Sequence, residues 1–428
     1  MKTQLQSMKW AVVALAAALA ACGGGGGDDD AGTPPTGGGT PTPPVGSATG
    51  VLTDAAVQGV AFSTSSGVTG TTDALGQYRY NPGDTVSFAL GALTLGAVPA
   101  TAVVTPIELA GGSNDKLQNL LVLLQSLDAD GVADNGINIP AAAAAAVTTG
   151  VDLASAPATF ASAANTGLAA AQTAGGISRA ITSSEAASAH FLSQAPALLS
   201  SQVWVDSSGT GTSAGFAFLR IGPAGEVLMG QAGPTAGGGF SGVELGSVLA
   251  TSVDARGFAL VPTLSVDTNG EWGLSSQDAC DRVRITGGQL VFDDAPASCV
   301  SDEIATATKA PNDNTTLVGV WAGGANIVNT QHFVFWADGR YAMIDPIGDT
   351  ENNCGGPGVE FGTYSYNAAT GAFRLLSVTV DSNGCAGLSD LGNANLASAQ
   401  VTLSADGKTA SFLFAGEPEV FPAYRISR

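Results

Sequence analysis

The sequence predicts a mainly β protein with an α-helical insert: a small β-sandwich, an Ala-rich helical segment and two repeated antiparallel β-barrel or sandwich domains. The repeat is visible as a ten-residue phrase, VDTNGEWGLS from Val266, which returns 114 residues later as VDSNGCAGLS from Val380. Short runs of alternating apolar and polar residues, separated by Gly- and Asn-containing turns, are typical of antiparallel strands. Ala-rich stretches with capping residues, which precede the repeat, indicate helices.

An export signal and a lipid-attachment site are predicted at the N-terminus. Two lysines precede an apolar stretch over residues 11–18, which is too short to remain as a membrane-spanning helix. The stretch ends in Leu19-Ala20-Ala21-Cys22, which closely resembles the lipobox of bacterial lipoproteins. That resemblance implies a signal peptide over residues 1–21 and acylation of Cys22. The alternative is a plain signal peptide with an A-x-A cleavage site.

The same resemblance implies an outer-membrane location. Gly23 follows the cysteine, where an inner-membrane retention aspartate often stands in enterobacterial lipoproteins. Two or more acyl chains would anchor the protein stably in outer-membrane lipid, because each buried methylene contributes about 0.8 kcal/mol. Residues 22–49 are rich in Gly, Pro, Thr and Asp and cannot bury a core, so we expect a flexible tether. The folded part would then stand off the membrane, at the periplasmic face or the cell surface.

Residues 50–110 are predicted to form a small β-sandwich module. Short β-type runs such as Gln77-Tyr78-Arg79-Tyr80 alternate with turn sequences such as Asn81-Pro82-Gly83-Asp84. The combination of Gly59-Val60, Thr72-Asp73-Ala74 and Gly76-Gln77-Tyr78 resembles carboxypeptidase-regulatory-like and related prealbumin-like modules. Those modules are small β-sandwiches of bacterial surface proteins, so the resemblance implies a spacer or binding module and not an enzyme.

Residues 111–197 are predicted to be a helical segment. Ser113 can cap a helix over residues 114–125, and Pro140 suits the first turn of a helix through the alanine run 141–146. A third helix can begin at Ser183 or Ser184 and reach Leu199, with an interruption at a proline. The high alanine content favours close packing of these helices.

A candidate calcium loop lies between the first two predicted helices. Asp128, Asp130 and Asp134 offer hard oxygen ligands beside Gly131, which is the chemistry that calcium loops use. The glycine stands at the fourth position rather than the sixth, and the distal bidentate glutamate of an EF-hand is missing. The three aspartates are therefore candidate metal ligands, and the alternative is a polar turn that ends a helix. No other cofactor is expected.

Residues 198–310 and 311–428 are predicted to be two copies of one β-domain. About six to eight strands per copy would close an antiparallel barrel or sandwich. The spacing between corresponding segments falls from 117 to 114 residues along the copies, with each loss in a loop. The corresponding segments are Trp204 with Trp321, Phe216–Phe218 with Phe333–Phe335, Gly222 with Gly339, Gly242–Ser247 with Gly358–Thr363, and Phe258 with Phe373.

The second copy opens with a motif known from another class of barrel. Leu317-Val318-Gly319-Val320-Trp321 resembles the G-x-W opening of lipocalin-like barrels. That resemblance implies a tryptophan that plugs one barrel end, and a ligand cavity inside. The first copy keeps Trp204 but has Gln202 where the glycine should stand.

Four cysteines remain once Cys22 is assigned to lipid. Cys280, Cys299, Cys354 and Cys385 are an even set in an exported chain, so two disulfides are expected. Of the three pairings that four cysteines allow, we favour the two that each fall within one copy of the repeat. A zinc site is the alternative, but no CxxC spacing supports it and the chain has only two histidines.

The charge excludes nucleic acid as a partner. The chain carries a formal net charge of −21, with 36 acidic and 15 basic residues. It has no basic patch with which to neutralise phosphate groups. The acidity favours solubility and is compatible with cation binding.

One motif suggests a serine hydrolase. Gly211-Thr212-Ser213-Ala214-Gly215 fits the G-x-S-x-G pattern of a nucleophile elbow. The elbow requires a strand before the serine and a helix after it, whereas here a Gly/Ser/Thr loop precedes and a predicted strand follows. His190 and His332 are the only imidazoles that could act as a base. We therefore expect no catalytic residue, and the hydrolase is the least favoured alternative.

The repeat also duplicates two acidic residues. Glu244 returns as Glu360, and Asp267 returns as Asp381. Repeated carboxylates could bind a cation or act as acid and base. The interpretation we favour is that they accept hydrogen bonds from turn amides at matching strand ends. Within the phrase, the Asn-Gly pair predicts a turn in which both central residues take positive φ, after an Asx turn at the aspartate.

Taken together, these patterns predict a lipid-anchored cell-envelope protein. We expect a non-catalytic, adhesin-like binding or spacer role toward an envelope or extracellular ligand of unknown identity. The alternative from another class is a carrier that holds a small apolar ligand inside the C-terminal β-barrels.

We predict that digestion without reductant releases two linked peptide pairs, one joining Cys280 to Cys299 and one joining Cys354 to Cys385. Each pair lies within one copy of the repeat, so each copy can oxidise by itself. Mass spectrometry of the digest checks this, with a reduced and alkylated digest as the control. A peptide that joins the two copies would contradict the assignment.

Overall fold

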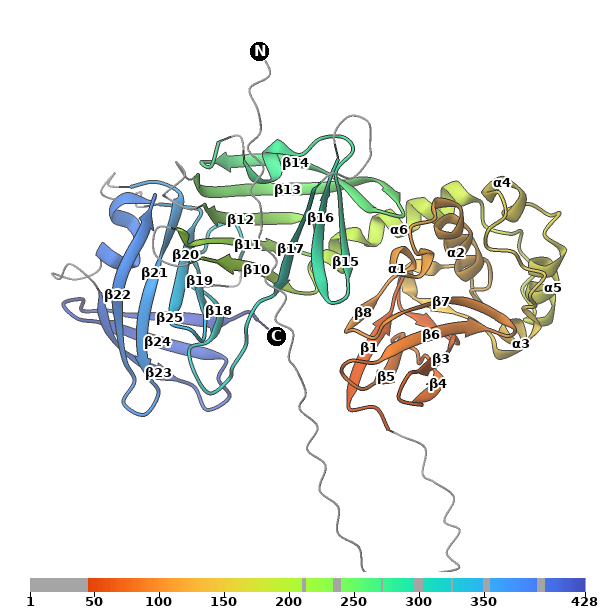
Figure 1. Ribbon diagram of the computed structural model, residues 1–428, viewed down its shortest axis with the longest axis horizontal. Helices are drawn as coiled ribbons and strands as arrows, with labels where there is room; N and C mark the ends of the chain where they lie inside the picture. Colours follow the sequence, from red (N-terminus) through yellow and green to blue (C-terminus); the bar gives the residue numbers. More distant parts are fainter. Residues whose placement is uncertain are drawn as a thin grey trace, which may run out of the picture. The chain divides into compact units, whose positions relative to one another are not determined.

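The chain folds into a mainly β protein, as the sequence predicts (Figure 1). The computed structural model describes residues 45–209, 213–233, 240–270, 272–295, 303–324, 326–348, 355–390 and 397–427. Cys22 and the predicted tether up to residue 44 lie outside this part, as do Cys299 and Cys354. Among the helices of the described ranges, none has the length and apolar character needed to cross a membrane.

The N-terminal module is built from two small sheets, in the strand orders β5-β1-β8 and β4-β3-β6-β7, and a short β2-β9 pair. Its core forms around Tyr78, whose ring meets Phe62 and Phe88 edge-on at centroid distances of 5.9 and 5.2 Å. The strands are β1 (Ala48–Leu52), β2 (Val57–Gln58), β3 (Ala61–Thr64), β4 (Thr69–Thr71), β5 (Gln77–Tyr80), β6 (Thr85–Leu90), β7 (Leu93–Pro99), β8 (Val103–Val104) and β9 (Ile137–Asn138).

The helical segment follows the predicted caps. The Ser113 hydroxyl accepts the amide of Lys116 at 3.2 Å, and the Ser183 hydroxyl accepts the amide of Ala186 at 3.1 Å. Both serines therefore satisfy a backbone donor that a helix start leaves free. The helices are α1 (Pro106–Ala110), α2 (Asn114–Ser126), α3 (Ala141–Ala146), α4 (Pro157–Phe160), α5 (Thr166–Ala174) and α6 (Ser184–Leu199).

The repeat forms two closed, eight-stranded antiparallel barrels in which each strand pairs with its neighbours in sequence. Barrel 1 closes where β10 pairs with β17, and barrel 2 closes where β18 pairs with β25. The strands of barrel 1 are β10 (Val203–Ser208), β11 (Gly215–Ile221), β12 (Glu226–Ala232), β13 (Ser241–Asp254), β14 (Gly257–Asp267), β15 (Arg282–Thr286), β16 (Gln289–Asp294) and β17 (Glu303–Lys309). The strands of barrel 2 are β18 (Gly319–Ala322), β19 (His332–Phe335), β20 (Arg340–Asp345), β21 (Gly358–Asn367), β22 (Ala372–Asp381), β23 (Ser398–Leu403), β24 (Thr409–Phe414) and β25 (Val420–Arg425).

The structure corrects the predicted alignment of the first hairpin. The tight turn after β11 is closed by the amide of Gly225, and the matching turn after β19 is closed by the amide of Gly339. Gly225, and not Gly222, is therefore the counterpart of Gly339. The sequence alignment of the two Phe-x-Phe patterns was therefore wrong by three residues. A register shift by an odd number of residues moves a side chain to the opposite face of a strand. Phe218 accordingly packs between the barrels, whereas Phe335 lines the interior of barrel 2.

The two barrels close their tight-turn ends differently. In barrel 2, the buried Trp321 lies under the guanidinium of Arg425, 4.2 Å from the ring centroid, and donates to the carbonyl of Leu317. A side chain at Gly319 would clash with that guanidinium, which explains the glycine of the G-x-W motif. In barrel 1, Trp204 instead donates to the carbonyl of Leu199 at the end of α6. With no arginine to accommodate, that copy has no need of the glycine.

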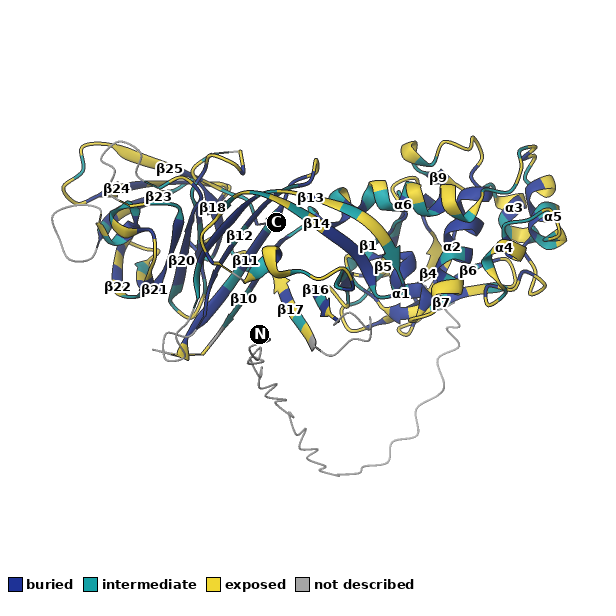
Figure 2. Cartoon of the chain, turned by 90° about the horizontal axis from the view of Figure 1, so that it is seen from above, coloured by how far each residue is buried: buried dark blue, intermediate teal, exposed yellow. Residues whose placement is uncertain are grey.

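The outer walls of the two barrels pack against each other. The apolar cluster between them draws on β10–β14 of barrel 1 and on the corresponding strands β18–β22 of barrel 2. The rings of Phe216 and Phe361 are 5.1 Å apart, and Gly230 lies against the side chain of Ile344. Figure 2 shows β11, β12, β18 and β20 of this contact as mostly buried. Their sequences consequently read as nearly continuous apolar runs, because both faces of the strands are covered.

Candidate functional site

The candidate functional site is the end of each barrel at which the repeated phrase lies. Lid 1 is defined as residues 267–276 and lid 2 as residues 381–390, and position 271 lies outside the described residues. Each lid follows a long strand and contains short 3₁₀ turns, Gly273–Ser276 in lid 1 and Gly384–Ala386 with Leu388–Asp390 in lid 2. A fully buried glutamate lies beneath each lid. It belongs to the strand paired with the one that the lid follows, which is β13 in barrel 1 and β21 in barrel 2.

Glu244 fixes lid 1 through two backbone hydrogen bonds. Its Oε2 accepts the amide of Leu274 at 2.7 Å, and its Oε1 accepts the amide of Ser275 at 2.8 Å. The strand register places Glu244 directly opposite Asp267, where β14 ends and the lid begins. One side chain therefore satisfies both amides of the turn that closes the barrel, which is the interpretation favoured from the sequence.

Glu360 fixes lid 2 in the same way. Its Oε2 accepts the amide and the hydroxyl of Ser389 at 3.0 and 2.9 Å. Its Oε1 accepts the hydroxyl of Tyr341, a residue of β20 with no polar counterpart in barrel 1. The register again places the glutamate opposite an aspartate, Asp381. The Ser389 amide therefore corresponds to the Ser275 amide of lid 1, and the hydroxyls of Ser389 and Tyr341 are the other donors to Glu360.

The last three letters of the phrase, GLS, form the contact between lid and barrel. The leucines, Leu274 and Leu388, are buried in the barrel cores. A Cβ on Gly273 would stand 2.6 Å from Glu244 Oε2, and a Cβ on Gly387 would clash with Glu360 Oε2. The glycine is therefore required for the glutamate to approach the lid backbone.

The first half of the phrase departs from the predicted turn. Asp381 does accept the amides of Asn383 and Gly384, as an Asx turn requires. However, Asn383 has φ −96° and only Gly384 has positive φ, at 63°. The expectation of two positive φ values was wrong because the phrase does not form a two-residue hairpin. Its asparagine side chain is turned into the barrel end.

Burial governs the electrostatics of both lids. It raises the pKa of Glu244 and of Glu360, and the negative charges of Asp267 and Asp381 raise these pKa values further. The ion pairs of the described residues involve neither glutamate. Each lid therefore holds a buried acid without a positively charged partner in the described chain.

The rim of lid 1 is fastened by an aromatic stack. Trp272 is 43% exposed and stacks on Phe240 with centroids 4.1 Å apart and an interplanar angle of 19°. In barrel 2, Gly242 corresponds to Gly358, so Cys354 stands two residues before the counterpart of Phe240. Cys385 takes the position next to the counterpart of Trp272. At the same place in the two copies, barrel 1 thus has a pair of stacked aromatic rings and the sequence of barrel 2 has two cysteines.

A second polar cluster joins three parts of the N-terminal region. The fully buried Asp54 accepts a hydrogen bond from Gln125 of α2 at 2.9 Å, and its Oδ1 lies 3.7 Å from His190 Nε2 of α6. His190 Nδ1 in turn lies 3.1 Å from Asp134 Oδ1. Burial raises the pKa of Asp54 to about 7. It also raises the pKa of Glu108 to about 7, and the carboxylate of Glu108 accepts the amide of Gly287 in barrel 1.

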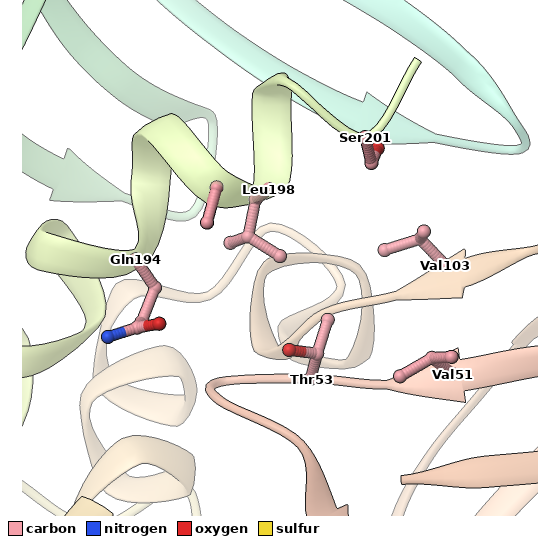
Figure 3. A pocket seen from close by; sticks show the side chains of 7 residues that line it. Val51, Thr53, Val103, Gln194, Leu198 and Ser201 are labelled. Carbon is pink, nitrogen blue, oxygen red and sulfur yellow. The ribbon is translucent and has the colours of Figure 1, made fainter. Parts of the chain in front are cut away.

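A small apolar pocket lies beside this cluster (Figure 3). Its volume is about 220 Å³, and no charged side chain lines it. Thr53, next to Asp54 in sequence, forms one wall together with β1 and β8, and Gln194, one helical turn after His190, forms part of the other. The remaining lining residues are Val51, Val103, Ala197, Leu198 and Ser201.

The three aspartates of the candidate calcium loop face different partners. Asp128 accepts the amides of Gly131 and Asn138, each at 2.9 Å. Asp130 accepts the amide of Val132 at 2.8 Å, and Asp134 faces His190. Across the described ranges, no group of three or more His, Cys, Asp or Glu side chains could hold a metal ion. These contacts match the polar-turn alternative, and calcium at this loop stays a prediction.

The serine motif does not form a nucleophile elbow in the described part of the chain. Ser213 is followed directly by strand β11, where the elbow needs a helix. Both ring nitrogens of His332 are engaged, Nδ1 with the carbonyl of Thr330 at 2.8 Å and Nε2 with Arg220 Nη1 at 2.6 Å. Burial and the charge of Arg220 lower the pKa of His332 to about 3, so this imidazole is neutral.

Sequence reasoning missed the two buried asparagines of the lids and the tyrosine that reaches Glu360. A polar residue that returns unchanged inside a repeated turn is a signal for the asparagines. The tyrosine has no such signal, because its partner stands in another strand. No protein-family model, curated protein or solved structure matches the chain. The function is therefore argued from the sites alone.

We predict that Glu244→Ala and Glu360→Ala each destabilise their barrel by about 1–3 kcal/mol, because each change leaves buried backbone donors without an acceptor. The denaturant midpoint measures this, with Glu419→Ala, an exposed position in the β24–β25 loop, as the matched control. Midpoints equal to that of the control would show that the lids do not depend on the glutamates.

We predict that acidification from pH 8 to pH 5 stabilises the N-terminal region through Asp54 and Glu108. Their pKa values in the folded protein are raised to about 7, above their ordinary values. The folded state therefore binds more protons than the unfolded state in this window. Stability falls as pH rises toward 7, by at most about 1.4 kcal/mol per pH unit for each group.

Unfolding at pH 5 and pH 8 measures this effect as the difference between wild type and Asp54→Asn or Glu108→Gln. Each variant should reduce the pH dependence, whereas Asp115→Asn, at an exposed position of α2, should not. The same pH dependence in all four proteins would contradict the assignment.

Proposed function

We propose that this protein is a lipid-anchored cell-envelope protein whose β-domains have a non-catalytic, adhesin-like binding or spacer role. The observation that carries the proposal is a pair of closed barrels, each with a lid, that follow an N-terminal sequence resembling a lipobox and a predicted tether. Such barrels are rigid bodies that can present loops at a distance from a membrane. The outer-membrane anchor is inferred from Leu19-Ala20-Ala21-Cys22 alone.

The packed interior of barrel 2 supports a scaffold rather than a carrier. Phe335 contacts Tyr364 and Phe373 at centroid distances of 5.0 and 5.8 Å, and Phe373 contacts Phe412 at 5.9 Å. Trp321 and Leu388 close the two ends of the same core. The side chains that could have lined a ligand cavity instead pack on each other. The carrier alternative therefore gains no support from the described residues.

The lid ends are the part of each barrel best suited to binding. Long connections gather there, whereas the opposite ends carry tight turns, and surface loops on a rigid scaffold are where binding residues concentrate. In barrel 1 the lid-end connections are 209–214, 233–240, 268–281 and 295–302, and the opposite turns are 222–225, 255–256 and 287–288. In barrel 2 they are 323–331, 346–357, 382–397 and 415–419, against 336–339, 368–371 and 404–408.

The proposal includes the disulfides Cys280–Cys299 and Cys354–Cys385, which suit an oxidising envelope compartment. Two contacts between described neighbours support them. Gly355, next to Cys354, lies against Gly384, next to Cys385. The amide of Ala295, on the chain that leads to Cys299, donates to Asp281, next to Cys280, at 2.9 Å.

We predict that the wild-type protein fractionates with outer-membrane lipid and that Cys22→Ser releases it into the soluble envelope fraction, because the acyl chains are lost. Membrane fractionation measures the anchor. Gly23→Asp is the matched control, since it keeps the acylated cysteine and should move the protein to the inner membrane of an enterobacterial host.

Protease treatment of intact cells then tests surface display. A Cys22→Ser protein that remains with the membrane would contradict the anchor. An apolar molecule recovered by lipid extraction of the non-acylated Cys22→Ser protein would favour the carrier.

A further inference from the structure

The two lids share a buried amide that has no partner. Asn269 is 5% exposed and Asn383 is 0% exposed, and neither the nitrogen nor the oxygen of either amide has a hydrogen-bond partner in the described chain. A buried polar group without a partner is destabilising, so such groups are rare in folded proteins. Here the same group recurs in two copies whose sequences have otherwise diverged. Its retention indicates that a ligand completes the hydrogen bonding.

Each amide borders the same small space as the buried glutamate. A Cβ built on Gly273 would lie 2.6 Å from Glu244 Oε2 and 2.8 Å from the amide nitrogen of Asn269. The corresponding position on Gly387 touches Glu360 Oε2 and lies 3.3 Å from the amide oxygen of Asn383. An asparagine amide can present either atom, because its oxygen and nitrogen are exchanged by a simple flip. A carboxylate oxygen and an amide oxygen can therefore face one point in each lid.

The charge of this space is negative and uncompensated. The strand register places Glu244 opposite Asp267 and Glu360 opposite Asp381, and the ion pairs of the described residues involve neither glutamate. Buried charges in proteins are normally paired or bound to a cation. The lids contain the acid without the counter-charge.

We propose that each lid binds one hard cation of the calcium class, held by Glu244 and Asn269 in lid 1 and by Glu360 and Asn383 in lid 2. Carboxylate and asparagine oxygens are the ligands that calcium takes, and six to eight oxygens surround it in proteins. Fewer than three carboxylates converge in the described lids, so backbone carbonyls and water would supply the rest. The cation would tie the strand that carries the glutamate to the turn that carries the asparagine.

Lid closure would then depend on calcium. The glutamate already holds the second half of each phrase, through the amides of Leu274 and Ser275 in lid 1 and through the amide and hydroxyl of Ser389 in lid 2. The cation would hold the first half through the asparagine. This site is distinct from the aspartates at 128, 130 and 134, which lie in the helical segment. It is also independent of the membrane anchor and of the proposed binding role.

The test is calcium binding by the full chain from Cys22 onward, freed of metal with a chelator and measured by calorimetry and by terbium luminescence. We expect two calcium ions per chain and a melting temperature at least about 2–4 °C higher in calcium than in chelator. Terbium bound in lid 2 should be sensitised by Tyr341, which donates to Glu360. Calcium should quench that emission by competition.

Variants then assign the sites. Asn269→Leu and Asn383→Leu should each remove one calcium ion per chain, and the double variant should remove both. Glu244→Gln and Glu360→Gln, which keep the side-chain shape, serve the same purpose if a leucine variant fails to fold. Asp130→Asn is the matched control and should leave both lid sites intact.

Two results would overturn the proposal. The first is a chain that takes up no calcium and emits no sensitised terbium light, which would mean that the asparagines hold an internal water molecule only. The second is calcium binding that persists in the double asparagine variant and is lost in Asp130→Asn, which would place the cation in the helical segment.

Discussion

A buried glutamate that accepts the amides of its own lid is the interaction on which each barrel's lid end depends. A closed antiparallel barrel has no free edges, but it has two open ends. In both copies the glutamate comes from the strand paired with the one that leads into the repeated phrase, and the phrase folds over it. The glycine of GLS lets the carboxylate approach, the leucine fills the barrel end, and the serine amide donates. The phrase is repeated because each of these contacts is needed at the same place.

The two copies close their opposite, tight-turn ends through different interactions. In barrel 1, Trp204 donates to the last carbonyl of α6. The core of this barrel continues into the helical segment through Phe258 and Phe191 of α6, whose rings are 5.1 Å apart. Barrel 2 has no such neighbour and closes with Arg425 over Trp321. The difference follows from position in the chain, since only the first copy is preceded by a folded helix.

Local patterns in the sequence predicted much of this fold. The caps at Ser113 and Ser183 and the expectation of about six to eight strands per copy follow from short-range rules, and the structure has eight strands in each barrel. The register of β11 could not be predicted, because two phenylalanines with the same spacing serve opposite faces in the two copies. The burial of Asn383 was also inaccessible, since Asn-Gly is a surface turn signal unless the chain continues into a lid. In both cases the sequence did not predict which face of a segment packs against another part of the protein. The spacing of neighbouring residues does not determine that face.

The contact between the barrels limits where a partner can bind. It uses the corresponding strands of each copy, β10–β14 and β18–β22, so the face that is alike in the two copies is covered by the contact between them. Arg220 and His332 join the two barrels at its edge, with a neutral imidazole accepting from the guanidinium. With that wall covered and the interior of barrel 2 filled, the described residues of the two barrels leave to a partner the lid ends and the outer faces of β15–β17 and β23–β25. On the β24–β25 hairpin, Leu413, Val420 and Tyr424 remain exposed on the outer face. The two lids differ most where lid 1 has the Phe240–Trp272 stack and lid 2 has Cys385. A partner that distinguishes the barrels would do so there.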